Sequence, residues 1–345
     1  SGTSVAEYAF TFEDEQTTVE LSKADLTDKK ELPGASLKVT DENGNTVDEW
    51  VSKEEAHIIK GLIVGKKYKM TETKPADGYV TAESIEFTVE NTKEVQKHQM
   101  LDDVTKVEIS KKDITDSSEV PGAKLIILDK DGKKVESWTS TDKPHMVEKL
   151  PVGEYTLREE QAPDGYLIAK DVKFTVKDTG KVQKVKMKDA HPYGKLVIKK
   201  TDSTSKAALS GAEFELREKE SGKVVEKLVT DKTGTATSGK IPIATYKNGK
   251  VEKTVKYILV ETKAPNGYEL SSKKEEIRFE YKDGKTKVIE IVKEIKNTKS
   301  PSGSTPTGNS PKTGDSTNIW LPILLAVLSA CGIGGVIWYK KKKGN

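Results

Sequence analysis

The stretch "YKMTETKPADGY" at residues 68–79 decides the fold of this chain, because it recurs twice in altered form. The two other copies are "YTLREEQAPDGY" (155–166) and "YILVETKAPNGY" (257–268). Each copy begins as an alternating strand and ends in a turn of Pro or Ala, Asp or Asn, and Gly. Side chains of a strand alternate between two faces, so Glu72 shares a face with the tyrosine and methionine before it. A glutamate at the end of a strand is thus placed in phase with apolar side chains.

A second recurring stretch shows that the body of the chain consists of three repeats. "VELSKAD" (19–25) returns as "VEISKKD" (107–113) and, more loosely, as "LVIKKTD" (196–202). Short alternating runs separated by frequent Gly and Pro turns predict all-β modules, each long enough for a sandwich of about seven strands. We name them module 1, module 2 and module 3, and we predict their bounds as 16–103, 104–190 and 191–298.

Module 3 is longer than the other two modules. Its extra residues fall at 230–257, where we expect a long hairpin or loop. At the other end of the chain, residues 12–23 can be laid on residues 100–111, which places Asp14 over Asp102. We therefore expect residues 1–15 to be the last strand of an earlier repeat, in a longer protein from which this chain is a part.

The composition excludes several classes of protein. The 345 residues are 34% hydrophobic and 33% charged, and the net charge is only +3. Apolar residues are patterned, which favours folded modules with small cores over disorder, and no basic domain points to nucleic acid. The one cysteine, Cys331, lies in an apolar segment, and the four histidines are scattered without metal-ligand spacing. We predict no metal, no cofactor and no disulfide.

Each module places three polar side chains in the phase of its apolar ones. A lysine follows two apolar residues on the first strand, a glutamate ends the middle strand, and an aspartate or asparagine ends the last strand. In module 3 the last strand also carries Lys293 in this phase. The predicted trios are Lys23, Glu72 and Asp102; Lys111, Glu159 and Asp189; and Lys200, Glu261 and Asn297.

These trios favour a specific chemistry. An unpaired buried charge costs several kcal/mol, and burial lowers the pKa of a lysine and raises that of a carboxyl. A neutral amine is a nucleophile, and a protonated glutamate can polarise a carbonyl and carry protons. The product would be an isopeptide bond between the first and last strands. The alternatives are a buried salt bridge with a hydrogen-bonded third member, or a polar group that reaches water at the strand end.

The last part of the chain has the pattern of a membrane anchor. Residues 319–339 are 21 residues without a charge. As a helix they would measure about 31 Å, enough to cross a bilayer core. "KKKK" at 340–343 places the following end in the cytoplasm, which leaves the three modules outside the cell. Residues 299–309, rich in Pro, Gly, Ser and Thr, are predicted to be a flexible linker.

Residues 310–345 resemble the sorting signal of Gram-positive surface proteins. That signal consists of an LPxTG pentapeptide, an apolar span and a basic tail, in this order. The resemblance implies cleavage between Thr313 and Gly314 by a sortase, attachment of Thr313 to peptidoglycan, and a transient single-pass membrane precursor. It implies a secreted protein that is anchored to the cell wall. Pro311, Thr313 and Gly314 match the pattern, whereas Ser310 stands where the family has leucine. The predicted sortase motif is Ser310, Pro311, Lys312, Thr313 and Gly314.

The modules resemble the Cna protein B-type domains of Gram-positive adhesins and pilins, which have a prealbumin-like, SpaA-type β-sandwich. The resemblance rests on "VxxxKxD" at the first strand, "ETxAPxGY" in the middle and Asp or Asn near the end. It implies spontaneous bonds between Lys23 and Asp102, between Lys111 and Asp189, and between Lys200 and Asn297. The assisting residues would be Glu72, Glu159 and Glu261.

We expect the chain to be the stalk of an adhesin rather than a turnover enzyme, because the only chemistry visible is directed at the chain itself. A pilin subunit polymerised by a sortase is the alternative, although the chain contains no "YPK"-like pilin motif. A third possibility is a ligand site for host extracellular matrix, with the insertion at 230–257 as its place.

Overall fold

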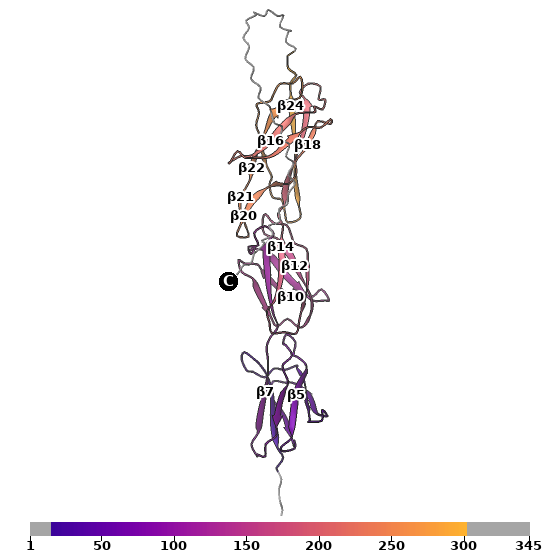
Figure 1. Ribbon diagram of the computed structural model, residues 1–345, viewed down its shortest axis with the longest axis vertical. Coiled ribbons are helices and arrows are strands. Elements are labelled where there is room, and N and C mark those ends of the chain that lie inside the picture. The colour runs from indigo at the N-terminus through magenta and orange to yellow at the C-terminus, as the bar shows by residue number, and fades with distance from the viewer. Residues whose placement is uncertain (1–14, 302–345) are drawn as a thin grey trace, which may run out of the picture. The chain divides into compact units, whose positions relative to one another are not determined.

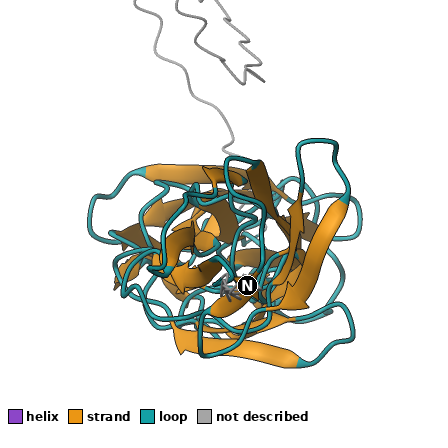
Figure 2. Cartoon of the chain, turned by 90° about the horizontal axis from the view of Figure 1, so that it is seen from below, coloured by secondary structure: helices purple, strands orange, loops and turns teal. Residues whose placement is uncertain are grey.

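The computed structural model describes residues 15–301, and every regular element among them is a β-strand. Figure 2 shows strands and loops only in this part of the chain. The expected all-β fold is confirmed. No helix within residues 15–301 is long and apolar enough to cross a membrane. The predictions for residues 1–14, for the sorting signal at 310–314 and for the apolar span at 319–339 lie outside the described residues.

Module 1 is a sandwich of two sheets, one with strand order β3-β2-β5-β6 and the other with order β4-β1-β7. The first and last strands, β1 and β7, are parallel neighbours, and Asp25 pairs with Asp102 in their register. Figure 1 labels β5 and β7 in this module. The strands are β1 (Thr18–Asp25), β2 (Ser36–Thr40), β3 (Thr46–Val51), β4 (His57–Lys60), β5 (Lys67–Lys74), β6 (Ile85–Thr88) and β7 (Gln96–Asp102).

Module 2 repeats this arrangement, with strand orders β10-β9-β12-β13 and β11-β8-β14. Its first and last strands, β8 and β14, are again parallel neighbours, and Asp113 pairs with Asp189. The strands are β8 (Lys106–Asp113), β9 (Lys124–Leu128), β10 (Lys134–Thr139), β11 (His145–Glu148), β12 (Gly153–Gln161), β13 (Val172–Val176) and β14 (Gln183–Asp189).

Module 3 keeps the two sheets and adds strands within its insertion. One sheet has order β17-β16-β22-β23, and in the other β15 pairs with β18, β19 and the last strand, β24. The insertion contains a separate hairpin, β20–β21. The strands are β15 (Tyr193–Asp202), β16 (Glu213–Glu218), β17 (Val224–Val229), β18 (Thr235–Thr237), β19 (Ile241–Pro242), β20 (Ala244–Lys247), β21 (Lys250–Thr254), β22 (Lys256–Lys263), β23 (Glu275–Arg278) and β24 (Val288–Asn297).

Alternation along the strands builds each core as the sequence predicts. On β1, Val19, Leu21 and Lys23 are buried, whereas Glu20 and Ser22 on the other face are half-buried. Each sandwich is filled by apolar side chains from both of its sheets, such as Leu21 and Leu37 in module 1. The same phase carries Lys23 into the interior, because a strand cannot turn one residue outward without turning its neighbours too.

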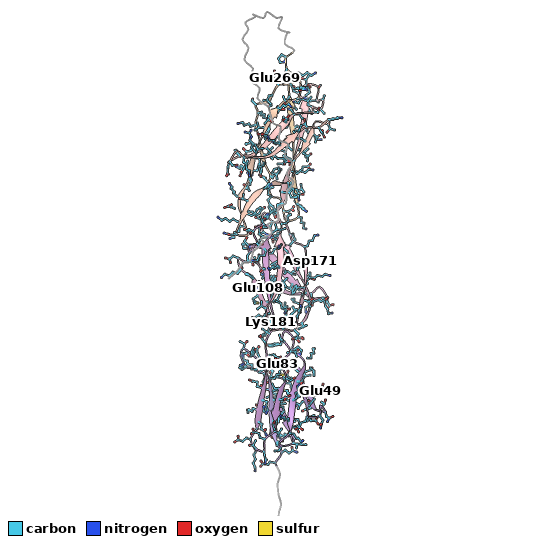
Figure 3. All side chains as sticks on the ribbon, in the orientation of Figure 1. Glu49, Glu83, Glu108, Asp171, Lys181 and Glu269 are labelled. Carbon is cyan, nitrogen blue, oxygen red and sulfur yellow. The ribbon has the colours of Figure 1, made fainter. Side chains whose placement is uncertain are left out.

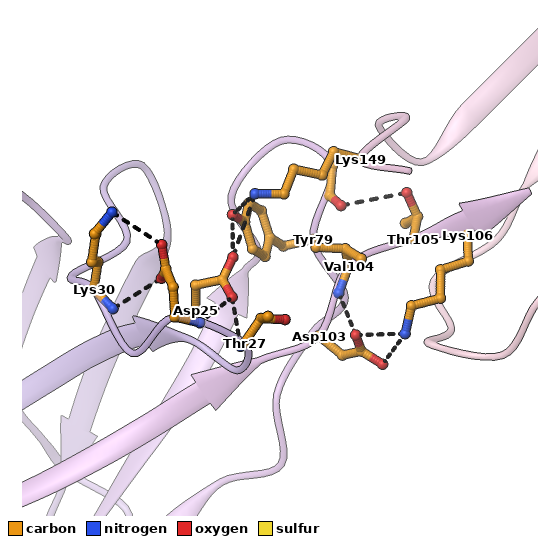
Figure 4. Close-up of polar contacts among 11 residues, drawn as sticks. Asp25, Thr27, Lys30, Tyr79, Asp103, Val104, Thr105, Lys106 and Lys149 are labelled. Atoms are coloured by element: carbon orange, nitrogen blue, oxygen red, sulfur yellow. Dashed lines mark hydrogen bonds and ion pairs between the residues drawn. The ribbon is translucent and has the colours of Figure 1, made fainter. Parts of the chain in front are cut away.

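Modules 1 and 2 contact each other through Lys149, which follows β11 (Figure 4). Its Nζ lies 2.6 Å from Tyr79 Oη and 3.4 Å from Asp25 Oδ2, both in module 1. Lys149 has a φ of 62°, and its counterpart in module 1 is Gly61, with a φ of 76°. A lysine in this left-handed conformation is strained, whereas glycine is not. Module 2 thus carries a strained residue at the point where its side chain reaches module 1.

Modules 2 and 3 contact each other through the hairpin β20–β21. Tyr246 of the hairpin donates a hydrogen bond of 2.8 Å to the carbonyl of Gly165. Its ring stacks on His191 with centroids 3.5 Å apart and an interplanar angle of 3°. His191 Nε2 in turn lies 2.8 Å from Asp113 Oδ2. The insertion of module 3 therefore includes a hairpin that packs against the neighbouring module.

Candidate functional site

The structure brings the three predicted side chains of each module together in its interior. The lysine comes from the first strand and the aspartate or asparagine from the last, so both lie in one sheet. The glutamate comes from a central strand of the facing sheet and reaches across the sandwich. All nine side chains belong to residues that are at most 4% exposed. We refer to each set as the trio of its module.

In module 1, Lys23 Nζ contacts Asp102 Oδ1 and lies 2.9 Å from Glu72 Oε1. The other carboxylate oxygen of Glu72 accepts a hydrogen bond of 2.7 Å from the backbone N–H of Ala82. That bond fixes the glutamate carboxyl against the loop before β6. The lysine amine is thereby held between the two carboxyl groups.

In module 2, Lys111 Nζ contacts Asp189 Oδ1 and lies 2.9 Å from Glu159 Oε2. The backbone N–H of Ala169 donates a hydrogen bond of 2.6 Å to the same carboxylate oxygen. Glu160, which follows the trio's glutamate, is exposed on the other face of β12. Module 2 therefore repeats the trio of module 1, except that the lysine and the backbone N–H share one oxygen of the glutamate.

In module 3, Asn297 replaces the aspartate and changes the hydrogen bonding. Lys200 Nζ contacts Asn297 Oδ1 and lies 3.3 Å from Glu261 Oε1. The Asn297 amide donates to both oxygens of Glu261, at 3.0 and 3.1 Å. The backbone N–H of Ser271 donates 2.8 Å to Glu261 Oε2. Glu261 thus already contacts the amide nitrogen that would have to leave in an isopeptide reaction.

The count of charges indicates that the trio of module 1 and the trio of module 2 each hold one proton more than the fully ionised carboxyls would. One ionised lysine and two ionised carboxyls would leave a net charge of −1 in a buried site, which is costly. Burial raises the pKa of Asp102 to about 7, opposed by Lys23 and helped by Glu72. Burial likewise raises the pKa of Asp189 to about 7. Oδ2 of each aspartate has no hydrogen-bond partner among residues 15–301, so it can carry that proton.

The trio of module 3 reaches neutrality without an extra proton. Asn297 carries no charge, so ionised Lys200 and ionised Glu261 already balance. Burial lowers the pKa of Lys200, although the Glu261 carboxylate opposes this shift. The lowered pKa increases the fraction of neutral amine, which is the form that attacks a carbonyl.

A second polar pair recurs beside each trio, and the sequence analysis did not identify it. The aspartate that ends the first strand accepts a hydrogen bond of 2.8 Å from the tyrosine of the "GY" turn, in all three modules. These pairs are Asp25 and Tyr79, Asp113 and Tyr166, and Asp202 and Tyr268. The recurrence of Asp in "KxD" and of Tyr in the turn could have indicated the contact.

The carboxylates of these pairs are held ionised by their hydrogen bonds. Burial alone would raise the pKa of Asp25, but bonds from the Thr27 amide and from Tyr79 lower it to about 2. Bonds from the Ser205 amide and from Tyr268 likewise lower the pKa of Asp202 to about 2. An ionised carboxylate at the end of module 1 explains why the Lys149 ammonium of module 2 lies there.

The histidines on β4 and β11 serve packing. His57 stacks on Trp50 with ring centroids 4.1 Å apart, and His145 stacks on Trp138 at 4.4 Å. Within residues 15–301 no group of three or more His, Cys, Asp or Glu side chains is arranged to hold a metal ion.

Comparisons with known proteins agree with this architecture. The family model described as "SpaA: Prealbumin-like fold domain" matches residues 17–103, 105–191 and 194–295. A structure of the Bacillus anthracis TIE protein is similar with a TM-score of 0.55 and 27% identity, and the match covers 83% of this chain and 52% of that one. This chain therefore spans about half the length of the TIE structure.

Two pilin structures are similar at lower scores. BcpA, the major pilin subunit of Bacillus cereus, has a TM-score of 0.49 and 19% identity, with 83% of this chain and 100% of that chain covered. The full-length major pilin SpaD of Corynebacterium diphtheriae has a TM-score of 0.38 and 19% identity, with 85% and 99% covered. A comparison with curated proteins gave no match.

Proposed function

Because the chain belongs to the SpaA prealbumin-like fold domain family, we propose that it forms the structural stalk of a cell-surface adhesin, stiffened by three isopeptide bonds. The observation that carries the proposal is the trio, buried and repeated in three modules. A buried salt bridge alone is weak support for stability, because the desolvation of its charges offsets their attraction. Three modules that retain the same costly group suggest that the group has a task of its own.

The reaction in modules 1 and 2 is a condensation. The neutral lysine amine attacks the carboxyl carbon of the aspartate, a bond between Nζ and Cγ forms, and the bond from Cγ to the hydroxyl breaks. The glutamate takes a proton from the amine and gives it to the departing hydroxyl, which leaves as water. Glu72 lies 2.9 Å from Lys23 Nζ and faces Asp102, as this transfer requires.

In module 3 the leaving group is ammonia. Lys200 Nζ attacks the amide carbon of Asn297, and the bond from this carbon to Nδ2 breaks. Glu261 passes the proton of the amine to Nδ2, with which it is already in contact at 3.0 Å. Each bond forms once and consumes its own reactants, so the chain is not a turnover enzyme.

The bonds would redirect a pulling force through each module. Since β1 and β7 are parallel neighbours, a load that enters β1 and leaves β7 shears the two strands apart. A bond from Lys23 to Asp102 carries that load directly, and the residues between them bear none of it. The bonds thereby take the place of the disulfides that staple other secreted domains.

We further propose that the stalk is attached to the cell wall through the sorting signal. The supporting observation is the order of the pentapeptide at 310–314, the apolar span at 319–339 and the basic tail. A sortase would cleave after Thr313 and join it to peptidoglycan. A laddered series on denaturing gels of wall extracts would instead favour polymerisation as a pilin.

Peptide mapping tests the proposed bonds one by one. After complete proteolysis of the denatured chain, three branched peptides are expected. Each would join a peptide of the first strand to one of the last strand, through Lys23, Lys111 or Lys200. Linear peptides alone, with these lysines unmodified, would contradict the proposal.

A further inference from the structure

A hollow of about 810 Å³ lies where module 2 meets module 3, and five lysines line it. We call it the lysine groove. One wall is the segment that leads into β13, the second is the last part of β14, and the third is the loop before β24. The two modules are joined beside it by a backbone hydrogen bond of 2.8 Å from Ile168 to Gly284. Its lysines are Lys170, Lys186, Lys188, Lys285 and Lys287.

The positive charge of the lysine groove is not neutralised within the described part of the chain. None of the five lysines has a carboxylate of residues 15–301 within 4.0 Å, whereas the neighbouring Lys184 pairs with Glu108 at 3.2 Å. The one acidic residue of the lining, Asp171 (Figure 3), is engaged by Arg158 at 2.7 Å. Five clustered like charges repel one another, so the groove favours an anionic partner.

The fold itself does not require these lysines. Module 1 carries Glu83, also labelled in Figure 3, at the position of Lys170. It carries Gln99 and Leu101 at the positions of Lys186 and Lys188. Charged residues can protect an exposed strand edge from pairing with other chains. Module 1 lacks these lysines, so such protection does not explain why module 2 has them. Module 2 contributes three lysines to the groove, and they lie beside the two lysines of module 3.

The shape of the lysine groove suits an extended chain. Within the described residues β14 pairs only with β8, so its other edge is open to a further strand. Lys186 and Lys188 point away from the core, because the alternate residues Val185 and Met187 are buried. The floor is apolar and includes Leu167 and Val172. A peptide beside β14 could place carboxylates on the lysines and apolar side chains on this floor.

The chemistry of the lining distinguishes a peptide from other anions. The lining has no arginine, whose planar fork is suited to phosphate, and no aromatic ring on which a sugar or base could stack. We propose that the lysine groove binds an extended acidic peptide segment of a partner protein, with alternating carboxylate and apolar side chains. This site goes beyond the stalk role, and it does not depend on the isopeptide bonds.

The test measures the fluorescence anisotropy of a labelled peptide of alternating glutamate and leucine, titrated with the purified chain. The decisive variant, Lys170→Glu/Lys186→Gln/Lys188→Leu, installs the residues of module 1. Exposed ion pairs are each worth a factor of about 2 to 5, so this variant should bind roughly 10- to 100-fold more weakly. The matched control, Lys143→Glu/Lys133→Gln/Lys134→Leu, alters exposed lysines away from the groove and should bind as the wild type does.

Further arms of the same experiment separate the alternatives. Lys285→Gln/Lys287→Gln should also weaken binding, because the groove is built from two modules. The proposal is overturned if the wild type does not bind the peptide, or if the decisive variant binds equally well. Inorganic polyphosphate that binds as tightly, with the same loss in the decisive variant, would overturn the assignment to a peptide.

Discussion

Removal of the Glu72 carboxyl by Glu72→Ala should make module 1 extensible under load. The variant keeps Lys23 and Asp102 in contact but lacks the proton carrier between them. In the wild type, the proposed bond between these residues would close off the 79-residue separation between them. Without the bond, that length is released when the module unfolds. At about 3.6 Å per residue, the 79 residues add roughly 280 Å of contour length.

Module 3 gives a length that differs from those of modules 1 and 2. Lys111 and Asp189 are 78 residues apart, so Glu159→Ala should release a similar length. Lys200 and Asn297 are 97 residues apart, so Glu261→Ala should release roughly 350 Å. The increment therefore separates the opening of module 3 from that of module 1 or module 2, and the variant used separates module 1 from module 2. The measured increment is the extended length minus the distance between the two ends of the segment in the folded module. That distance is small, because the two ends are in contact.

Single-molecule force spectroscopy on the chain, held at both ends, measures these increments. The wild type should show no step of either length before the tether detaches. Glu72→Ala should add one step of the shorter kind, and the control Glu83→Ala, which alters an exposed glutamate of module 1, should add none. Wild-type traces that contain all three steps would refute the reasoning, and so would a Glu72→Ala trace without a new step.

Three further predictions follow from the same contacts. Lys149→Gly installs the residue of module 1 and relieves a strained φ, so module 2 should stay folded. Modules 1 and 2 should then tumble more independently in ¹⁵N relaxation measurements. Unchanged relaxation would count against the Lys149 contact. Asp25→Asn, in a Glu72→Ala background, should destabilise module 1 to denaturant at pH 7 but hardly at pH 2. The folded pKa of about 2 lies below the ordinary 3.8, so this stabilisation is present above about pH 4 and is lost as the pH falls toward 2; an equal loss at both pH values would contradict it. Asn297→Asp should give a chain of the same mass as the wild type, because loss of water from Asp and loss of ammonia from Asn leave the same amide; a mass difference equal to that between Asp and Asn would show that the module 3 bond is absent.

Strand alternation made the buried trios predictable from the sequence. Lys23 lies two residues after Leu21 on β1, and a strand with one buried face must bury both. The same rule holds on β24, where Asn297 is buried. Lys293, in the same phase on that strand, stays half-exposed and lies 3.6 Å from Glu275. Phase therefore indicates the face of a side chain but not how deeply that side chain is buried.

Contacts between modules were not predictable in this way. In the sequence, Lys149 has no feature that separates it from other loop residues. Its φ and its contact with Tyr79, both seen in the structure, indicate a role between modules. The insertion at 230–257 was expected to be a long hairpin or loop, and it contains the hairpin β20–β21. Nothing in its residue pattern indicated that Tyr246 would donate a hydrogen bond to the carbonyl of Gly165 in module 2. Such contacts join surfaces of separate cores, and no periodic pattern along the chain encodes which surfaces meet.

The intact mass of the purified chain, measured under denaturing conditions, tests the central claim most directly. Denaturation removes every salt bridge and hydrogen bond of the trios, so only a covalent bond can change the mass. If the three bonds are present, the mass lies below that of the sequence by two water molecules and one ammonia, from the trios of Lys23, Lys111 and Lys200. A mass equal to that of the full sequence would contradict it.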